Sequence, residues 1–364
     1  MNSLNAMPTL TAGDHAPWFV LPSHADVLMG GYRSVLFFFG GTAQNPQIQQ
    51  VLTGLAAAQN QLAAAGFSFF GVSIDPRDKE LEGRIQTNDK FRLLWDFQGD
   101  LSMRYGVLGS DKNGITYDPT SFILDENLRV VQVIPLVTNK NHVAQILQAV
   151  QTLPPIASPQ LAQRHAPVLQ IPQVFSPNFC RHLIQLYEAD GGTDSGFMQQ
   201  DGEKTAIVMN PQVKRRRDLI LTDAALQSHI NSLIWRRIQP EIEKAFQFKV
   251  TRYERYTVAC YEAGNQGFFR AHRDNTTMGS AHRRFAMTLN LNTGEYEGGS
   301  LHFPEYSTAQ YSPGIGDALI FSCSLLHEAT PVTKGRRFVL LSFFFNDEDA
   351  KLREQTQKQI MREG

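Results

Sequence analysis

The chain has 364 residues, of which 42% are hydrophobic and 19% charged, and its formal net charge is −1. This composition is typical of a soluble globular protein, and the length predicts about two domains. The near-neutral charge gives no indication of a nucleic acid or an anionic membrane as partner, and no apolar run approaches the ~18 residues of a membrane-spanning helix. The three cysteines are too few for a disulfide framework, and residues 1–10 lack the features of a secretory signal. We therefore expect a cytoplasmic protein.

Strands and helices alternate in the first half of the chain, from residue 9 to about residue 153, which predicts an α/β layer. Residues 33–39 form a continuous apolar run, RSVLFFF, typical of a strand that is buried on both faces. Pro46 and Gly66 are suited to begin and end the helix that follows. The other elements expected here are strands over residues 67–74, 93–95, 121–124 and 128–133, a polar helix over 78–87 and a last helix over 140–150.

A proline-rich segment, residues 154–166, separates the two halves, because proline disfavours helix and sheet alike. Two helices follow it, for which Asn178 and Asp223 are the expected N-caps, and Pro240 is expected to break the second. From residue 251 onward short strands alternate with turns, which predicts a jelly-roll barrel, or double-stranded β-helix, with supporting helices. The predicted parts are a domain over 1–153, a linker over 154–166, a barrel domain over 167–350 and a charged helical tail over 351–364.

A candidate metal site begins at His272 and Asp274, which one residue separates, so that on a strand both side chains would point to the same side. His327 is a third candidate ligand, and Arg337 follows it by ten positions. Two histidines and one carboxylate leave half of an octahedral metal open, which suits Fe(II) that handles O2 together with a chelating substrate. Each residue alone reads better as an ordinary polar side chain of a barrel. Zinc is a weaker alternative, because the cysteines form no Cys-x-x-Cys pair.

The residues around this set make a family resemblance specific. The second half, from about residue 167 to residue 346, resembles the prolyl 4-hydroxylase-like branch of the 2-oxoglutarate/Fe(II) dioxygenases. The matching segments are VACYEAG at 258–264, GFF at 267–269, HRDN at 272–275, GGSLHF at 298–303, Pro313 with GDALIF at 316–321, HEATPV at 327–332 and KGRR at 334–337. The resemblance implies that His272, Asp274 and His327 hold the metal and form the catalytic centre.

The same resemblance implies how 2-oxoglutarate is bound. Arg337 would pair with its distal carboxylate, since a planar guanidinium meets a carboxylate through two parallel hydrogen bonds. Arg336 competes for this role, because residues 338–345 are apolar on both faces and alternation cannot decide; the family spacing selects Arg337. Tyr261 matches a family tyrosine near the cosubstrate. Asn290 stands where relatives often have another tyrosine and is a further candidate contact.

The basic run Lys214-Arg215-Arg216-Arg217 has two readings. Such a run usually means a solvated loop. The alternative is that it binds an acidic or carboxylate-bearing substrate.

The resemblance implies an Fe(II)-dependent dioxygenase with 2-oxoglutarate and O2 as cosubstrates and ascorbate as a candidate reductant. It would hydroxylate an unactivated C–H bond and release succinate and CO2. The implied substrate is a prolyl or related amino-acid unit, in a peptide or protein or as a free cyclic amino acid. A non-catalytic protein that senses oxygen or 2-oxoglutarate is the alternative, because a motif does not reveal turnover.

The first half resembles the thioredoxin-fold peroxiredoxins of the alkyl hydroperoxide reductase/thiol-specific antioxidant type. The matching pieces are AGDHAP at 12–17, FFF at 37–39, Thr42, GVSID at 71–75, YGV at 105–107 and SFILD at 121–125. That family has a cysteine three residues after the threonine, where this chain has Asn45, and no cysteine precedes Cys180. An amide cannot form the thiolate that attacks a peroxide. We therefore expect a redox-inactive domain that handles substrate or self-associates, with a homodimer as the expected partner arrangement, and we regard a thiol peroxidase as nearly excluded.

Overall fold

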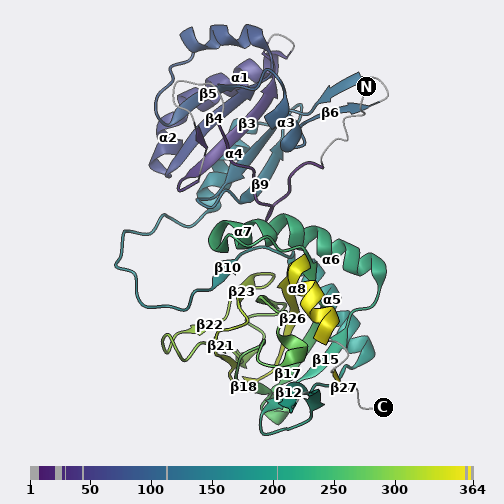
Figure 1. The fold of residues 1–364 in the computed structure, drawn as a ribbon. Coiled ribbons are helices and arrows are strands. Elements are labelled where there is room, and N and C mark those ends of the chain that lie inside the picture. Colours follow the sequence, from purple (N-terminus) through teal and green to yellow (C-terminus); the bar gives the residue numbers. More distant parts are fainter. Residues whose placement is uncertain are drawn as a thin grey trace. The chain divides into compact units, whose positions relative to one another are not determined.

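The computed structural model describes residues 8–20, 27–28, 30–42, 45–111, 114–202, 204–356 and 360–361 (Figure 1). The chain divides into two compact units, Met1–Gln160 and Leu161–Gly364. Residues 153–166 carry no regular secondary structure apart from a short bend at residue 153, and the division falls within the predicted linker. Each unit has its own hydrophobic core and is described by itself.

The N-terminal unit is built on a five-stranded sheet with the order β5-β4-β3-β8-β9. Strands β3, β4 and β5 are parallel to one another, and β8 and β9 continue the sheet in antiparallel pairs. The strand bounds are β3 Arg33–Gly40, β4 Phe67–Ser73, β5 Phe91–Trp95, β8 Thr120–Leu124 and β9 Val130–Pro135. The unit's helices are α1 Pro46–Ala57, α2 Gln59–Ala64, α3 Asp100–Arg104 and α4 His142–Thr152, with a 3-10 segment η1 over Pro76–Gly83. Two small hairpins pair β1 Phe19–Val20 with β2 Val27–Leu28 and β6 Leu108–Asp111 with β7 Gly114–Tyr117.

Both faces of this sheet are covered, which explains the continuous apolar run of β3. Val35, Phe37 and Phe39 point into a core shared with α1 and α4. Leu36 and Phe38 point the other way, into a core shared with α3 and the N-terminal segment. The unit therefore has the thioredoxin-like α/β fold that the sequence predicts. The helix expected over 78–87 is instead the shorter η1, a 3-10 helix that begins at Pro76 with Asp75 as its N-cap.

The C-terminal unit is a jelly roll whose larger sheet has the order β10-β23-β19-β26-β17-β15-β11, with β16 paired to β26. A smaller sheet, with the order β14-β18-β24-β21-β22, forms the second wall. The larger sheet consists of β10 Leu169–Ile171, β11 Thr193–Asp194, β15 Arg217–Ile220, β16 Arg252–Tyr253, β17 Thr257–Glu262, β19 Phe285–Asn290, β23 Ala318–Ser322 and β26 Arg336–Phe345. The smaller consists of β14 Lys214–Arg215, β18 Phe268–His272, β21 Leu301–His302, β22 Gln310–Tyr311 and β24 His327–Ala329.

Shorter elements decorate this barrel. A hairpin of β12 Phe197–Asp201 and β13 Lys204–Val208 is extended by β27 Ile360–Met361, and β20 Glu297–Gly298 pairs with β25 Val332–Lys334. Two 3-10 segments are η2 Ala263–Asn265 and η3 Met278–Ser280. The predicted tail over 351–364 contains the end of helix α8, Asp347–Thr356, and β27; residues 357–359 and 362–364 of that tail lie outside the described residues.

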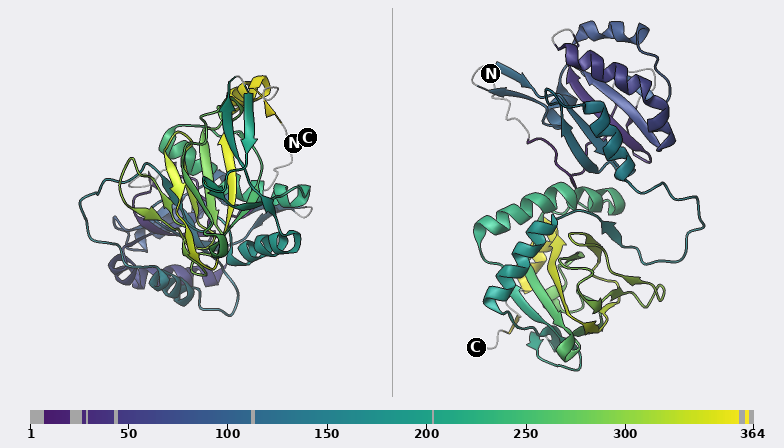
Figure 2. Two further views of the ribbon diagram at one scale, coloured as in Figure 1. Left: turned by 90° about the horizontal axis from the view of Figure 1, so that it is seen from below. Right: turned by 180° about the vertical axis from the view of Figure 1, so that it is seen from behind.

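Helices α5 Pro177–Asp190, α6 Ala224–Arg237 and α7 Gln239–Phe246 pack on the outer face of the larger sheet (Figures 1 and 2). Asp223 caps α6 as predicted, and Pro240 lies in the first turn of α7, directly after the break. The expected cap Asn178 is wrong: Ser176 accepts from the Phe179 amide, and α5 begins at Pro177. Proline is favoured at the first helical position because its missing N–H has no partner there anyway.

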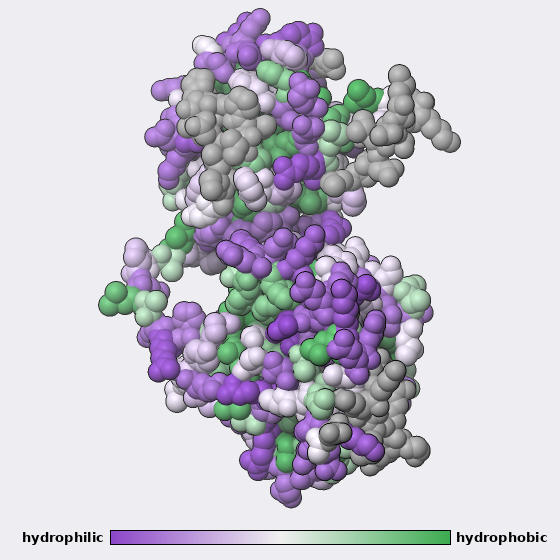
Figure 3. All heavy atoms as spheres, in the orientation of Figure 1, coloured by the Kyte–Doolittle hydropathy of each residue, from purple (hydrophilic) through white to green (hydrophobic). Residues whose placement is uncertain are grey.

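The visible face of each unit mixes hydrophilic and hydrophobic residues (Figure 3). In the described ranges no helix is long and apolar enough to cross a membrane.

Candidate functional site

The three predicted metal ligands come together at one end of the smaller sheet. His272 is the last residue of β18 and His327 the first of β24, and the two residues are directly opposite each other in the antiparallel pair. Asp274 lies beyond the end of β18, in a turn where its amide donates to the Cys323 carbonyl at 3.0 Å. The prediction that a strand places His272 and Asp274 on one side is therefore only half right, because the turn, not strand alternation, directs the carboxylate.

Their atoms have the spacing of a metal-binding set. Asp274 Oδ1 lies 3.5 Å from His272 Nε2, and its Oδ2 lies 3.4 Å from His327 Nε2. All three potential ligand atoms lie within 4.8 Å of one another. Two ligand atoms that bind a metal at about 2.1 Å and at right angles lie roughly 3 Å apart, so a small adjustment would complete the coordination. The residues present fit Fe(II).

Hydrogen bonds to the backbone fix the orientation of both imidazoles. His272 Nδ1 lies 2.7 Å from the Arg270 carbonyl, and His327 Nδ1 lies 3.0 Å from the Leu325 carbonyl. A carbonyl only accepts, so Nδ1 carries the proton in each ring and Nε2 presents its lone pair to the metal position.

The charge states also suit a cation. Burial alone would raise the pKa of Asp274, but the neighbouring His327 and His272 outweigh it and hold that pKa well below its usual range. Burial lowers the pKa of His327 to about 4. An ionised carboxylate beside a neutral imidazole is the form in which these groups bind a metal, since ligands must be deprotonated.

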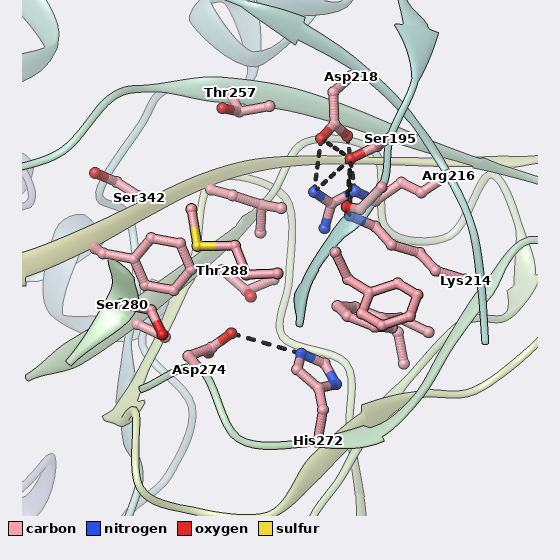
Figure 4. A pocket seen from close by; sticks show the side chains of 18 of the residues that line it. Ser195, Lys214, Arg216, Asp218, Thr257, His272, Asp274, Ser280, Thr288 and Ser342 are labelled. Atoms are coloured by element: carbon pink, nitrogen blue, oxygen red, sulfur yellow. Dashed lines mark hydrogen bonds and ion pairs between the residues drawn. The ribbon is translucent and has the colours of Figure 1, made fainter. Parts of the chain in front are cut away.

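A cavity of about 770 Å³ opens beside the three ligands, and Figure 4 shows part of its wall. Tyr261 and Arg337 also line it, each contributed by an inward-facing position of the larger sheet. In β26, Val339 points inward like Arg337, whereas Phe338 packs against the outer helices. Alternation along β26 thus delivers one guanidinium into the barrel.

Arg337 is a buried cation without an anionic partner in the part of the chain that the structure describes. Its side chain is 2% exposed, and its Nε has no hydrogen-bond partner. Its Nη2 makes one long bond, 3.4 Å, to Asn290 Oδ1, and the Tyr261 ring lies 5.3 Å from its guanidinium carbon. Leaving a charge buried and unpaired is costly. The arrangement therefore suits an incoming carboxylate.

Tyr261 and Asn290 have different positions. Tyr261 lines the cavity, and its hydroxyl accepts from Arg216 at 3.5 Å. Asn290 is buried behind the wall, and its amide nitrogen donates to Thr293 Oγ1 and to the Pro313 carbonyl, each at 3.0 Å. Asn290 thus orients Arg337 and does not line the cavity, which differs from the cosubstrate contact expected from sequence.

Comparisons with known proteins agree with this geometry. Residues 256–345 match the family model described as the 2OG-Fe(II) oxygenase superfamily, and that range contains the three candidate ligands and Arg337. The C-terminal unit resembles the 2OG-Fe(II) oxygenases. Residues 12–133 match the AhpC/TSA family model, so the N-terminal unit resembles the peroxiredoxins of that family.

A PKHD-type hydroxylase of Saccharophagus degradans is 37% identical over 94 residues, which cover 24% of this chain and 40% of that relative. The chain thus spans less than half the length of the curated relative it matches. Among solved structures, a viral collagen prolyl hydroxylase from Paramecium bursaria Chlorella virus 1 is similar at 15% identity over 49% of this chain and 96% of its own, with a TM-score of 0.38. Peroxidoxin BcpB from Mycobacterium tuberculosis is similar at 22% identity over 40% of this chain and 99% of its own, with a TM-score of 0.34.

In the AhpC/TSA-like unit, Asn45 performs a structural task at the place of the family's cysteine. It is the N-cap of α1, and its Oδ1 accepts from the Gln47 amide at 3.0 Å. The nearby Thr42 hydroxyl donates to the buried Asp78, whose other oxygen accepts from Ser73 Oγ at 2.5 Å. The three cysteines of the chain are free and buried. The position of the family's cysteine therefore holds an amide, which cannot form a thiolate.

Sequence reasoning underrated two residues of the oxygenase-like unit. Lys214 and Arg216 belong to the basic run first read as a solvated loop, yet both are buried or nearly so and line the cavity. Arg215 and Arg217 of the same run point outward and are exposed or half-exposed. The signal that could have found the inward pair is the alternation of a strand, since residues 214 and 216 share a face with Asp218.

Proposed function

We propose that the C-terminal unit is an Fe(II)- and 2-oxoglutarate-dependent dioxygenase that hydroxylates an unactivated C–H bond. Its substrate is a prolyl or related amino-acid unit, and the by-products are succinate and CO2. Ascorbate is a candidate reductant. The observation that carries this proposal is the unpaired, buried Arg337 on the wall of the same cavity as the His272, Asp274 and His327 cluster.

The residues of the chain divide the work. His272, Asp274 and His327 offer three ligands from one side, which leaves the opposite positions open to 2-oxoglutarate and O2. Bound Fe(II) would supply the oxidative chemistry that no side chain can perform. Arg337 fixes the distal carboxylate of 2-oxoglutarate, and Asn290 keeps the guanidinium in place.

The cavity wall contributes positioning and the exclusion of water. Met287, Leu341 and Phe343 line it with apolar surface. A substrate held against such a wall presents one carbon to the metal position in a fixed geometry, which lowers the entropic part of the barrier. The prolyl preference is drawn from the similarity to prolyl hydroxylases.

A test is the conversion of 2-oxoglutarate by the full chain reconstituted with Fe(II) in air. Cell extract is then supplied, and products heavier by one oxygen atom are sought by mass spectrometry. Succinate together with such a product supports the dioxygenase. Iron and 2-oxoglutarate binding without any succinate would favour the sensor alternative instead.

We further propose that the AhpC/TSA-like unit serves self-association as a homodimer and not peroxide reduction. Asn45, which caps α1 where the family has its reactive cysteine, supports the absence of peroxide reduction. Sedimentation of the full chain tests this proposal: a dimer is expected, and a monomer at all concentrations would contradict it.

A further inference from the structure

Three cationic side chains gather on one side of the cavity in the oxygenase-like unit. Lys214 and Arg216 come from the run that contains β14 and leads into β15, and Arg255 precedes β17. Figure 4 shows Lys214 and Arg216 across the cavity from His272 and Asp274. This group, Lys214, Arg216 and Arg255, is called the cation cluster below.

The hydrogen bonds of Lys214 involve neutral acceptors only. Its Nζ donates to Ser195 Oγ at 2.7 Å and to the Gly196 carbonyl at 2.6 Å, and the residue is 8% exposed. Burial lowers the pKa of Lys214, and the adjacent Arg216 lowers it further. An ammonium in this setting lacks a full counter-charge, which a bound anion would provide.

Arg216 already forms an ion pair with the carboxylate of Asp218. Its Nε and Nη2 donate to the two oxygens of Asp218 at 2.7 and 2.6 Å. Ser195 Oγ also donates to Asp218 at 2.5 Å. Both oxygens of Asp218 thus already accept hydrogen bonds from Arg216 and Ser195.

Arg255 makes no hydrogen bond or salt bridge with any residue that the structure describes, although it lines the cavity and is exposed. The carboxylate next to it in sequence, Glu254, is used by others: it accepts from His282 at 2.8 Å and from Arg283 at 2.6 and 3.0 Å. The Arg255 guanidinium is thus available to a ligand.

The charges in this part of the cavity leave an excess of positive charge. Among the described residues, the carboxylate of the inner wall that pairs with the cation cluster is Asp218, and Asp274 lies with the two histidines. Two further carboxylates of the lining, Asp190 and Asp194, belong to exposed residues at the rim. In the proposed function, the charges of Fe(II), Arg337, Asp274 and 2-oxoglutarate together sum to zero. The excess therefore remains for the substrate.

We propose that the substrate is a free cyclic amino acid whose carboxylate is bound by Lys214 and Arg255, beside the ion pair of Arg216 and Asp218. This inference rests on the proposed function and narrows its substrate class. A free carboxylate meets guanidinium and ammonium groups through charge-assisted hydrogen bonds. A prolyl unit within a peptide has its carboxyl group in an amide bond, so it would leave the cation cluster without an anion.

The experiment measures binding and requires no turnover. L-proline and L-pipecolate are titrated into the full chain, with and without saturating 2-oxoglutarate, and their amides are titrated in parallel. Ligand-observed NMR reports the dissociation constants. At least one acid is expected to bind at least tenfold more tightly than its amide.

Arg255→Gln is the main variant, because this side chain holds no structural hydrogen bond, and it should weaken binding of the acid at least tenfold. Arg252→Gln is the matched control: it lies three residues earlier, in β16, pairs with Asp347 at the surface, and should leave binding unchanged. Lys214→Met should also weaken binding, with the melting temperature of each variant measured to verify folding.

Three results would overturn the proposal: neither acid binds, acid and amide bind equally, or Arg255→Gln binds like the wild type. A capped, proline-containing peptide that binds better than both acids would assign the cavity to a peptide. Failure of the proposed function has a separate readout, the absence of succinate. A protein that never converts 2-oxoglutarate could still bind the acid more tightly than the amide in this assay.

Discussion

Arg336 and Arg337 are neighbours in β26 that point to opposite sides of the larger sheet. Arg336 Nη2 donates to Glu188 Oε1 of α5 at 2.6 Å on the outer surface, whereas Arg337 is buried and lines the cavity. Of these two arginines, Arg337 is therefore the one in a position to bind a ligand inside the barrel.

Arg337→Ala is expected to raise the KM for 2-oxoglutarate roughly tenfold to hundredfold, because the loss of a charge-assisted contact costs about 1.5–3 kcal/mol. Arg336→Ala loses only a surface ion pair and should change the KM little. Succinate formation at increasing 2-oxoglutarate concentration measures both. If Arg336→Ala proved the damaging change, the assignment of Arg337 would be wrong.

The sequence reached this arginine pair but could not separate its members from residue types alone. Residues 338–345 are apolar on both faces, because α5, α6 and α7 cover the outer face and the inner face packs in the interior of the barrel. Alternation therefore carried no information there, and a family spacing was needed. The metal ligands were predictable as a set, but the turn that directs Asp274 was not.

Other features depended on contacts that no local pattern encodes. The basic run 214–217 splits into an inward and an outward pair only because β14 and β15 join the two walls of the barrel. Arg255 does not pair with the neighbouring Glu254, because that carboxylate accepts hydrogen bonds from Arg283, a residue distant in sequence. The α/β layer of the N-terminal unit, by contrast, was readable because each buried strand is locally apolar.

Asn45→Ala is expected to destabilise α1 by about 1 kcal/mol, because the helix loses the side chain that caps its first turn. Asn45→Asp keeps a capping oxygen and should have little effect, which makes it the matched control. Hydrogen exchange of the α1 amides should accelerate about fivefold in the alanine variant. Equal exchange in both variants would show that the cap contributes nothing.

His142 should make the N-terminal unit less stable in acid. It is buried, its ring nitrogen Nε2 lies 2.9 Å from Ser121 Oγ, and burial lowers its pKa to about 4. Because the folded pKa lies below the ordinary value of about 6.5, its contribution is complete above that value and is lost as pH falls from 6.5 to 4. The loss is on the order of 2–3 kcal/mol.

Hydrogen exchange of α4 between pH 7.5 and pH 4, corrected for the intrinsic rate, measures this loss. His142→Gln removes the titrating group and should flatten the pH dependence relative to the wild type. Identical profiles for the two proteins would mean that His142 is protonated without cost in the folded state.

The full chain should show no thiol-dependent reduction of hydrogen peroxide. Asn45 cannot form a thiolate, and burial raises the pKa of Cys180 and of Cys260, each to about 12, and raises the pKa of Cys323 well above its usual range. Peroxide consumption with dithiothreitol or thioredoxin as donor is the measurement. Turnover that disappears on replacement of any one cysteine would contradict this account of the AhpC/TSA-like unit.

The most direct test of the central claim is bound iron and succinate yield measured on the same samples of wild-type and Asp274→Ala protein. His302→Ala serves as control, because this histidine of the smaller sheet bonds Glu328 and lies outside the triad. The account predicts stoichiometric Fe(II) and succinate formation for the wild type and the control, and loss of both for Asp274→Ala. A folded Asp274→Ala protein that retains full iron content and full succinate formation would contradict it.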